Sequence, residues 1–378
     1  MKVIVLGAGR VGCAIARDLA RDGQFAVTAA DLTATACASM YGEAGILSLK
    51  ADLSDPAELE RLLRGQDLVI GAVPGFLGFE TLRRVIELGK NVVDISFFDE
   101  DAFTLDELAR ERGVVACVDC GVAPGASNLI LGHLESVLDE TERFACYVGG
   151  LPVVRSWPYE YKAPFSPLDV IEEYTRPARL RRQGEPLTLP ALSEVELLDF
   201  PGVGTLEAFN TDGLRTLLHT SRTPTLIEKT LRYPGHAEKM RMLRESGFFS
   251  EEPLVLAGTQ VRPRDLAARL LLQAWRFAEG EEDLTVMRIE IEGRREGRGV
   301  RHSFRLLDRY DPATRTSSMA RTTGYTCAAV ARLIARGLYT RPGITPPELL
   351  GREVGCYEFV MSELEARGVR FEEEVVAE

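Results

Sequence analysis

Short apolar runs and helical patterns alternate along the first third of the chain. The runs cover residues 2–6, 25–30, 46–52, 67–74, 91–96 and 114–119. They are rich in Val, Ile, Leu and Ala with little polar alternation, which is typical of strands buried on both faces of a parallel sheet. Helical spacing lies between them, over residues 13–20, 34–42, 57–64, 79–88 and 105–112. This alternation predicts an α/β fold, a doubly wound Rossmann sheet over residues 1–125.

The pattern changes after residue 125. Helical spacing recurs over 128–137 and 168–174, and short strands are expected over 143–148, 178–182, 185–189, 194–199 and 205–208. Residues 284–293 alternate apolar and polar positions, as a half-exposed strand does, and we expect them to pair with 301–308 across the turn 293–299. Residues 126–320 are therefore predicted to form a second α+β domain with a mixed sheet, for substrate binding and oligomerisation.

The C-terminal residues return to helical patterns. Amphipathic spacing covers 323–336 and 355–367, and the Gly- and Pro-rich stretch 343–348 indicates a turn. We expect residues 321–378 to be helices that return to the Rossmann domain and cover an edge of its sheet.

A glycine pattern joins the first strand to the first helix. It consists of Gly7, Ala8, Gly9, Arg10, Val11 and Gly12. Strand, G-x-G-x-x-G and helix in this order are the fingerprint of a dinucleotide site. Its glycines allow a tight turn, close approach of a pyrophosphate and close packing of helix on strand, while the helix N-terminus supplies N–H groups for the phosphates.

The second predicted strand ends at Asp31, nineteen positions beyond Gly12. A carboxylate there accepts hydrogen bonds from the adenosine ribose and repels a 2′-phosphate. Thr33 and Ala34 follow, and no Arg stands beside Asp31. The sequence therefore predicts NAD as the cofactor.

Further cofactor contacts are expected at the carboxyl ends of the other strands, where ligands of open α/β sheets bind. The candidates are Asp52, Val73, Pro74 and Ser96. Asp52 is also placed to cap the helix that begins near Pro56, and this alternative stays open.

Composition limits the classes of function. The chain has 378 residues, 27% of them charged, and a net charge of −12. This balance argues against nucleic acid and anionic membranes as partners. No apolar run approaches the ~20 residues of a membrane span, and the N-terminus enters a strand at once, so we expect a cytoplasmic protein without a secretory signal.

The metal-binding residue types are scattered. The seven cysteines are 13, 37, 117, 120, 146, 327 and 356, and the four histidines are 133, 219, 236 and 302. Cys117 and Cys120 have C-x-x-C spacing, but they lie along a predicted strand and no second pair occurs, and the histidines have no metal-ligand spacing. We expect reduced, buried thiols and no metal.

Several sequence strings, from the glycine pattern at 7–12 to the stretch at 230–236, resemble the saccharopine dehydrogenase family and, within it, the lysine 6-dehydrogenase branch. The most specific are Glu-Glu-Tyr-Thr-Arg-Pro-Ala-Arg at 172–179 and Thr-Leu-Arg-Tyr-Pro-Gly-His at 230–236. The resemblance implies an NAD-dependent oxidative deamination of the ε-amine of L-lysine, whose semialdehyde product closes to a cyclic imine. Phe165-Ser166-Pro167 stands where the branch tends to have Trp-Ser-Pro, a departure close to the expected substrate pocket.

Such a reaction needs a group that manages the amine proton, because a lysine ammonium has a pKa of ~10.4. Asp119, at the end of the sixth strand, is the first candidate, with a capping role as the alternative, and Asp94 is the second. Lys162, in an aromatic and Pro-bounded stretch, is either a proton carrier or a surface lysine in a loop.

The substrate carboxylate calls for an Arg fork. Arg232 is the first candidate, against a structural ion pair, and Arg215 the second. Thr230 and Tyr233 are expected to add hydroxyl contacts, and His236 either touches substrate or acts as a cap.

Two alternatives remain open at this point. In the first, the fold and the reaction type are the same but the substrate is saccharopine or a carboxylated polyamine, as in carboxynorspermidine-type enzymes. In the second, the chain is a non-catalytic NAD sensor. The expected partners are a small amino-acid substrate and further copies of the chain, as a homodimer or homotetramer.

Overall fold

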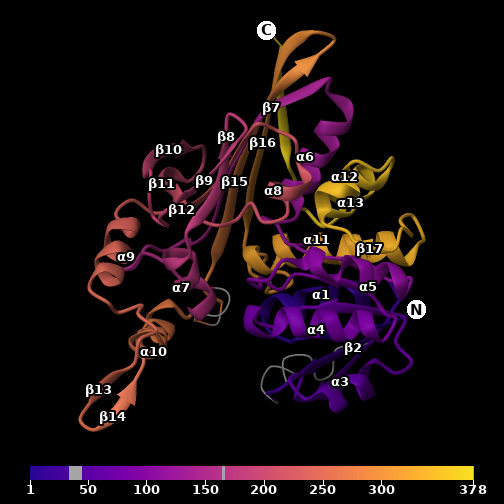
Figure 1. The fold of residues 1–378 in the computed structure, drawn as a ribbon, viewed down its shortest axis with the longest axis horizontal. Coiled ribbons are helices and arrows are strands. Elements are labelled where there is room, and N and C mark those ends of the chain that lie inside the picture. Colours follow the sequence, from indigo (N-terminus) through magenta and orange to yellow (C-terminus); the bar gives the residue numbers. More distant parts are fainter. Residues whose placement is uncertain (34–44, 164–166, 279, 378) are drawn as a thin grey trace. The chain divides into compact units, whose positions relative to one another are not determined.

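The structure is a computed structural model that describes residues 1–33, 45–163, 167–278 and 280–377 (Figure 1). The chain divides into two units. The first comprises residues 1–137 and 320–369, and the second residues 138–319 and 370–378. The helix predicted over 34–42 lies outside the described residues.

The first unit is built on one sheet of seven parallel strands in the order β17-β6-β5-β4-β1-β2-β3. The strands are β1 Lys2–Leu6, β2 Ala26–Asp31, β3 Ile46–Lys50, β4 Leu68–Gly71, β5 Asn91–Asp94, β6 Val115–Cys117 and β17 Gly343–Ile344. Strand order reverses between β1 and β4, which is the switch point where such sheets bind nucleotides. The predicted Rossmann sheet is confirmed.

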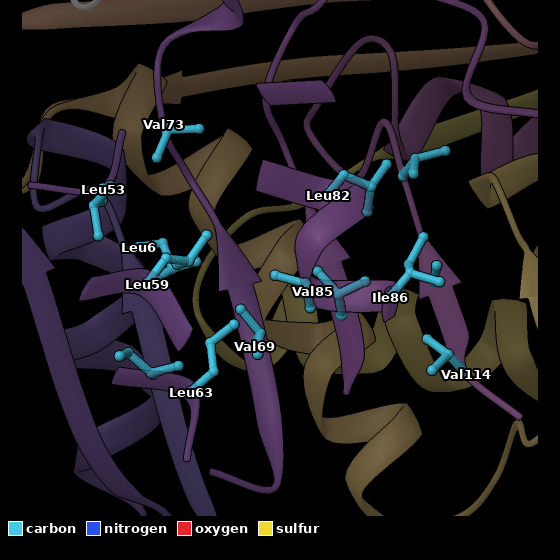
Figure 2. Close-up of a cluster of buried hydrophobic side chains, with 14 of the residues drawn as sticks. Leu6, Leu53, Leu59, Leu63, Val69, Val73, Leu82, Val85, Ile86 and Val114 are labelled. Atoms are coloured by element: carbon cyan, nitrogen blue, oxygen red, sulfur yellow. The ribbon is translucent and has the colours of Figure 1, made fainter. Parts of the chain in front are cut away.

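The helices of the first unit flank this sheet. They are α1 Arg10–Arg21, α3 Pro56–Leu63, α4 Gly75–Glu87, α5 Asp106–Glu111, α6 Ala126–Val137, α12 Pro347–Gly351 and α13 Cys356–Ala366, with the 3₁₀ turn η1 Ala102–Leu105. Helix α11 runs over Ser318–Ala335 and enters this unit at residue 320. Figure 2 shows part of the core, where Leu59 and Leu63 of α3 lie beside Leu6 and Val69 of the sheet. This packing explains why the strand runs lack polar alternation.

Helix α4 begins four residues before the predicted start. Its N-cap is Pro74. Gly75 and Gly78, in the first turn of the helix, pack against the segment that follows β5. A Cβ on Gly75 would lie 2.3 Å from the Phe97 carbonyl oxygen, and one on Gly78 would lie 2.7 Å from the Ser96 Cβ. The two glycines therefore bring the helix against the carboxyl end of β5, a tertiary contact that propensity does not indicate.

Two segments belong to a different unit from the one that the sequence predicted for them. Helix α6 belongs to the first unit because it packs on α12: a Cβ on Gly132 would lie 2.0 Å from the Glu348 carbonyl oxygen. Residues 370–378 belong to the second unit because β18, Glu372–Ala377, pairs antiparallel with β16, Arg298–Arg309.

The prediction of a turn over 343–348 was incomplete. Gly343 donates its N–H to the Val114 carbonyl (2.9 Å) and Thr345 donates to the Ala116 carbonyl (2.8 Å), so the segment adds β17 to the sheet beside β6. The Ile344 N–H donates to the Asp106 carboxylate (2.9 Å). Two strand residues are too few to show a period in the sequence.

The second unit contains a mixed sheet of nine strands, with a path β10-β11-β12-β7-β15-β16-β18 and with β8 and β9 attached to β12. The strands not yet bounded are β7 Glu140–Pro152, β8 Ala178–Arg182, β9 Glu185–Leu189, β10 Glu196–Phe200, β11 Gly204–Asn210, β12 Thr225–Arg232 and β15 Asp283–Arg295. Strand β12 runs parallel to β7, and the other pairings are antiparallel. The predicted α+β domain with a mixed sheet is confirmed.

Several elements of this unit have no counterpart in the predicted pattern. They are β12, the helices α8 Leu217–Thr220, α9 His236–Glu245 and α10 Pro263–Trp275, and the hairpin β13 Leu254–Leu256 with β14 Thr259–Val261. Helix α7, Pro167–Thr175, was expected. Strand β12 was missed because both its polar and its apolar residues are buried, so burial gives no alternation.

The β15–β16 hairpin is longer than predicted. Its strands pair up to Arg295 and Arg298, and Glu296 and Gly297 form the turn with φ of 54° and 75°. Two central residues with positive φ match the right-handed twist of the strands. The predicted turn over 293–299 is therefore reduced to two residues.

Candidate active site

The glycine turn has the geometry that a dinucleotide requires. Gly7 has φ +99°, and a Cβ there would lie 2.3 Å from the Ala72 carbonyl oxygen. A Cβ on Gly12 would lie 1.9 Å from the Gly7 carbonyl oxygen, so these two glycines serve packing of the turn. A Cβ on Gly9 would meet nothing within 4 Å. The backbone at Gly9 is thus open to a ligand, as the fingerprint requires.

Helix α1 starts directly after this turn. Gly9 is its N-cap and forms no side-chain cap hydrogen bond, so the N–H groups of the first turn face outward from the helix end. Arg10 is exposed and Val11 half-buried, while Ala8 is buried. The uncapped N-terminus of a twelve-residue helix is suited to a pyrophosphate.

Asp31 ends β2 beside the turn. Its Oδ2 accepts the Ala8 N–H (2.8 Å) and its Oδ1 accepts the Thr33 N–H (2.9 Å). These two bonds orient the carboxylate and leave further acceptor sites on both oxygens. The register partner of Asp31 on β3 is Lys50.

Asp52 does not cap α3, so this alternative was wrong. Asp55 is the N-cap, and its carboxylate accepts the Ala57 N–H at 2.9 Å. Asp52 instead accepts the Ser54 hydroxyl (2.6 Å) and N–H (2.9 Å), and these hydrogen bonds lower the pKa of its carboxyl. The cap falls on Asp55 because Pro56 occupies the first helical position.

Asp94 and Ser96 are buried together at the carboxyl end of β5. The Ser96 N–H donates to Asp94 Oδ1 at 2.7 Å. Asp94 is 1% exposed, and its Oδ2 would lie 1.7 Å from a Cβ on Gly71, so its side chain lies over the end of β4. The predicted contacts Val73 and Pro74 follow β4, with Val73 buried and Pro74 exposed.

Asp119 lies two residues beyond the end of β6. It is 3% exposed and has φ +55°, a conformation that Asp tolerates better than most residues. The N–H of Cys120 donates to the Asp94 carbonyl (3.0 Å), which joins the end of β6 to the end of β5. Two carboxylates from neighbouring strands therefore stand at the same edge of the sheet, the edge expected to bind ligands.

The loop after Asp119 is tightly held. A Cβ on Gly125 would lie 1.7 Å from the Gly121 carbonyl oxygen, so the loop folds back on itself. The Asn128 amide donates to Glu348 Oε2 at 3.2 Å, and both side chains are buried. These contacts fix the backbone that carries Asp119.

In the second unit, Arg232 is an internal ion-pair partner. Its Nη2 donates to Glu173 Oε2 (2.8 Å) and its Nη1 to the Leu231 carbonyl (2.9 Å). The guanidinium lies 4.3 Å from the centroid of the Tyr161 ring, and the side chain is 4% exposed. The alternative of a structural ion pair is what the structure shows, so a substrate carboxylate would meet a charge that Glu173 already balances.

The residues around Arg232 have internal partners as well. Tyr233 donates its hydroxyl to the Pro152 carbonyl (2.9 Å), and the Thr230 hydroxyl lies 2.8 Å from that of Thr211. His236 Nδ1 lies 3.0 Å from the Tyr159 carbonyl, and Nε2 lies 2.9 Å from the Tyr174 hydroxyl.

Burial and the charge of Arg232 lower the pKa of His236 to about 3. The ring is therefore neutral near pH 7, donating from Nδ1 and accepting at Nε2. It is a fixed structural link rather than a proton carrier.

Lys162 has the surroundings of a structural lysine. Its Nζ donates to the Arg276 carbonyl (3.0 Å) and to Glu281 Oε2 (3.2 Å). The alternative of a lysine in a loop fits these contacts better.

Arg215 belongs to a cationic cluster that the sequence analysis did not recognise. Arg179 forms a bidentate pair with Asp212: its Nε donates to Oδ1 at 2.9 Å and its Nη2 donates to Oδ2 at 2.8 Å. Burial lowers the pKa of Arg176, and Arg215 and Arg179 lower it further, although Asp212 raises it. Arg215 and Arg179 are thus close enough to Arg176 to interact with it electrostatically, and Asp212 is paired with Arg179.

The comparisons with known proteins agree with this geometry. Two family models match consecutive parts of the chain: the saccharopine dehydrogenase NADP binding domain over residues 3–117 and the saccharopine dehydrogenase C-terminal domain over residues 121–369. The chain belongs to the saccharopine dehydrogenase family. This confirms the family that the sequence strings indicated, and the sheet with its glycine turn is a pyridine-nucleotide-binding domain.

Curated relatives of this family member cover the chain to different extents. Saccharopine dehydrogenase [NADP(+), L-glutamate-forming] of Schizosaccharomyces pombe is 22% identical over 100% of this chain and 99% of its own length. Mouse mitochondrial alpha-aminoadipic semialdehyde synthase is 26% identical over 66% of this chain but only 29% of its own length. Carboxynorspermidine synthase of Vibrio cholerae is 22% identical over 93% of this chain and 92% of its own.

The fold is also found in a solved structure. Apo saccharopine dehydrogenase from Saccharomyces cerevisiae superimposes with a TM-score of 0.81 at 20% identity and covers 99% of both chains. In the described residues of this family member, no helix is long and apolar enough to cross a membrane. The same residues contain no group of three or more His, Cys, Asp and Glu side chains that could hold a metal ion.

Glu228 is a further buried polar residue that sequence reasoning missed. It is 8% exposed, and its Oε2 accepts the Thr211 hydroxyl at 2.7 Å. Burial raises the pKa of its carboxyl to about 8, and nearby Glu173 and Asp212 raise it further while the Thr211 hydrogen bond opposes them. The signal available in the sequence was Glu228 directly after the apolar pair Leu226-Ile227.

Proposed function

We propose that this family member catalyses the NAD-dependent oxidative deamination of the ε-amine of L-lysine, to the 6-semialdehyde and its cyclic imine. The observation that carries the proposal is the edge of the first-unit sheet. There the open Gly9 backbone and Asp31 stand at the ends of β1 and β2, and Asp94 and Asp119 at the ends of β5 and β6. Family membership supports the reaction class, and the names of the relatives support lysine-derived substrates.

The residues at this edge fit a bound nicotinamide dinucleotide. The first turn of α1 and the backbone of Gly9 would hold the pyrophosphate, and Asp31 would hold the adenosine ribose. Asp52, Val73, Pro74 and Ser96 are proposed to line the remainder. When bound, NAD accepts a hydride from the carbon that bears the amine.

The choice of NAD over NADP rests on Asp31. Its carboxylate would repel a 2′-phosphate, and residues 32–49 contain no Lys or Arg to hold one. Lys50, its register partner, is the nearest cation along β3. The matching family model and the S. pombe relative are named for NADP, so the proposal gives this chain a different coenzyme from the one in their names.

Coenzyme choice is tested by the ratio of kcat/KM for NAD and NADP. Asp31→Ser combined with Leu32→Arg should shift this ratio toward NADP at least tenfold, because it removes the repelling charge and adds a fork for the phosphate. Glu60→Gln, at an exposed acid of α3, is the matched control and should leave the ratio unchanged. A wild-type preference for NADP would refute the coenzyme proposal while leaving the reaction class standing.

The chain's own contribution to the chemistry is proton management. At neutral pH the substrate amine is an ammonium, and it must lose a proton before its carbon is oxidised. Asp119 is proposed to bind the amine and accept this proton, and Asp94 is the second candidate. Their burial excludes water from the carbon that reacts.

The substrate carboxylate requires a cationic partner, and the candidates are Arg215 and Arg232. Arg232 is already paired with Glu173, whose carboxylate balances its charge. We therefore propose Arg215 ahead of Arg232 as the carboxylate fork, with Thr230, Tyr233 and His236 in supporting positions.

The substrate is tested by the absorbance of the reduced coenzyme on a panel of lysine, saccharopine and carboxynorspermidine. Growth of absorbance with lysine alone supports the proposal. Growth with saccharopine alone supports the second candidate, which the full-length similarity to the S. pombe enzyme favours. Binding of NAD without turnover of any member would indicate a sensor and refute both.

The role of Asp119 is tested by Asp119→Asn. We expect kcat to fall about 100-fold or more, the usual loss for a general base, with the Kd for NAD nearly unchanged. Glu107→Gln, on the exposed face of α5, is the matched control and should retain full activity. Equal turnover of Asp119→Asn and wild type would remove Asp119 from the mechanism.

A further inference from the structure

The second unit contains a buried carboxylic acid that the proposed chemistry does not use. Glu228 lies on β12, beside β11 in the nine-stranded sheet (Figure 1), and is 8% exposed. Burying a carboxyl is costly unless its oxygens make compensating contacts. The contacts of Glu228 therefore indicate what it does.

Glu228 holds the segment 211–213, which directly follows β11. Its Oε2 accepts the Thr211 hydroxyl at 2.7 Å, and the Gly213 N–H also donates to the carboxyl. A Cβ on Gly213 would lie 2.5 Å from both Cδ and Oε2 of Glu228, so the backbone passes directly against the carboxyl. A residue with a side chain would prevent this approach. The carboxyl thus binds the segment at two alternate residues.

The residue between them is held from another strand. Asp212 accepts the bidentate fork of Arg179 on β8 and also the backbone N–H of Arg179, at 3.1 Å. The Thr211 hydroxyl lies 2.8 Å from that of Thr230, which stands two residues from Glu228 on the same face of β12. Side chains from two strands therefore fix three successive residues of the segment.

This segment leads into Arg215, whose backbone is unusual. Arg215 has φ +47° and is 8% exposed. A residue with a Cβ keeps such a conformation only where its surroundings hold it. On the C-terminal side, the Leu218 N–H donates to the Arg215 carbonyl at 3.3 Å, at the start of α8. On the N-terminal side the hold comes from the segment 211–213, and so from Glu228.

We propose that Glu228 is a positioning residue for substrate binding: by holding Thr211 and Gly213 it fixes the backbone that directs Arg215 to the substrate carboxylate. The role rests on the proposed function, in which Arg215 is the carboxylate fork. Glu228 acts through the backbone and not by touching substrate. Its loss should therefore weaken substrate binding and leave hydride transfer and NAD binding largely intact.

The charge of Glu228 matters to this role. The titratable groups near it come from separate elements, and they are Glu173 of α7, Asp212 after β11, Cys146 opposite it on β7 and Arg232 four residues along β12. Burial raises the pKa of the Glu228 carboxyl to about 8, and Glu173 and Asp212 add to the rise. The carboxyl is neutral near pH 7. Above pH 8 it becomes a negative charge beside Asp212, which repels the segment that it holds.

The experiment is steady-state kinetics of the full chain at saturating NAD, with the member of the substrate panel that is turned over. Glu228→Ala removes the acceptor, and Gly213→Ala forces the backbone away from the carboxyl without a change of charge. Each should raise the KM for substrate at least about tenfold, while kcat falls less than about threefold and the KM for NAD is unchanged.

Two further variants serve as controls for these. Glu228→Gln keeps the shape of the side chain and an acceptor oxygen, so it should keep the wild-type KM at pH 7. Glu185→Gln, at an exposed acid of β9, should leave all constants unchanged.

A pH profile separates positioning from a merely structural role. The substrate and Asp119 titrate alike in wild type and in Glu228→Gln, so the ratio of their KM values isolates Glu228. We expect this ratio to be near one at pH 7. At pH 9 the wild-type KM should be at least about threefold higher, because only the wild-type carboxyl ionises.

Hydrogen exchange tests the same contacts without turnover. Amides of residues 211–216 should exchange faster in Glu228→Ala and Gly213→Ala than in wild type, and equally in Glu228→Gln. Circular dichroism shows whether each variant folds. If Glu228→Ala does not fold, Gly213→Ala and the pH dependence of Glu228→Gln decide the matter.

The outcomes distinguish this role from the proposed function. An unchanged KM in folded Glu228→Ala and Gly213→Ala, a loss of kcat as large as the rise in KM, or a KM ratio equal at both pH values would overturn the positioning role and leave the proposed function standing. Absence of turnover of every panel member by wild type would instead refute the proposed function, and the substrate role of Glu228 with it.

Discussion

The C-terminal helices are tied to the nucleotide-binding helix by buried charges, and Asp18→Asn tests this link. Asp18 of α1 is 3% exposed. Its Oδ2 accepts Arg332 Nη1 of α11 at 2.6 Å, and its Oδ1 accepts Arg367 Nε, just after α13, at 2.7 Å. Arg332 is itself 1% exposed. The substitution keeps the shape of the side chain and removes the charge between two arginines.

The loss of stability can be estimated from these contacts. Removing one partner of a buried ion pair costs about 3–5 kcal/mol. Asp22, 2.9 Å from Arg332 Nε, and Glu363, 2.8 Å from Arg367 Nη1, remain as partners. We therefore expect the low end, about 3 kcal/mol, which is roughly a 100-fold change in the unfolding equilibrium and a fall in Tm of about 6–12 °C.

The assay is urea unfolding followed by two probes. Both tryptophans, Trp157 and Trp275, belong to the second unit, so their fluorescence reports on that unit, whereas circular dichroism reports on both. The circular dichroism transition should move to lower urea in Asp18→Asn. Asp22→Asn, at a half-exposed partner of the same arginine, should cost less than about 1 kcal/mol. If Asp18→Asn is no more destabilising than Asp22→Asn, the buried link does not hold these helices.

Three further changes test other parts of the structure. The pKa of Glu228 is raised in the folded state to about 8, so the folded chain keeps a proton that the unfolded chain releases near pH 4.5, and stability falls as pH rises between these values. Glu228→Gln should therefore stabilise the chain by at least about 2 kcal/mol more at pH 8 than at pH 5. Equal gains in urea unfolding at the two pH values would refute the burial argument. Glu173→Gln leaves Arg232 buried without its counter-charge and should cost about 3 kcal/mol, whereas Glu172→Gln, in a more exposed pair, should cost less than about 1 kcal/mol by the same measurement. Gly132→Ala would place a Cβ 2.0 Å from a carbonyl oxygen of α12 and should lower stability by about 2 kcal/mol or more; an unchanged Tm would mean that the two helices separate easily.

The sequence determined the first unit closely, because its signals are local. A strand buried on both faces has no polar alternation, and a turn that must pass a backbone oxygen within 2.3 Å of a Cβ position requires glycine at Gly7. The same local logic placed Asp31 at a strand end, and the structure shows its carboxylate hydrogen-bonded to the glycine turn. These features depend on residues close in the chain, so the pattern alone is sufficient to find them.

Tertiary structure decided which polar residues are already paired. Arg232 has the same appearance in the sequence whether it meets a substrate or Glu173, 59 residues away, and Lys162 the same whether it carries a proton or pairs with Glu281. The cluster around Asp212 and the buried Glu228 arise where distant strands and loops converge. The physical reason is that the charge and pKa of a side chain depend on its neighbours in space, and chain pattern specifies only its neighbours along the backbone.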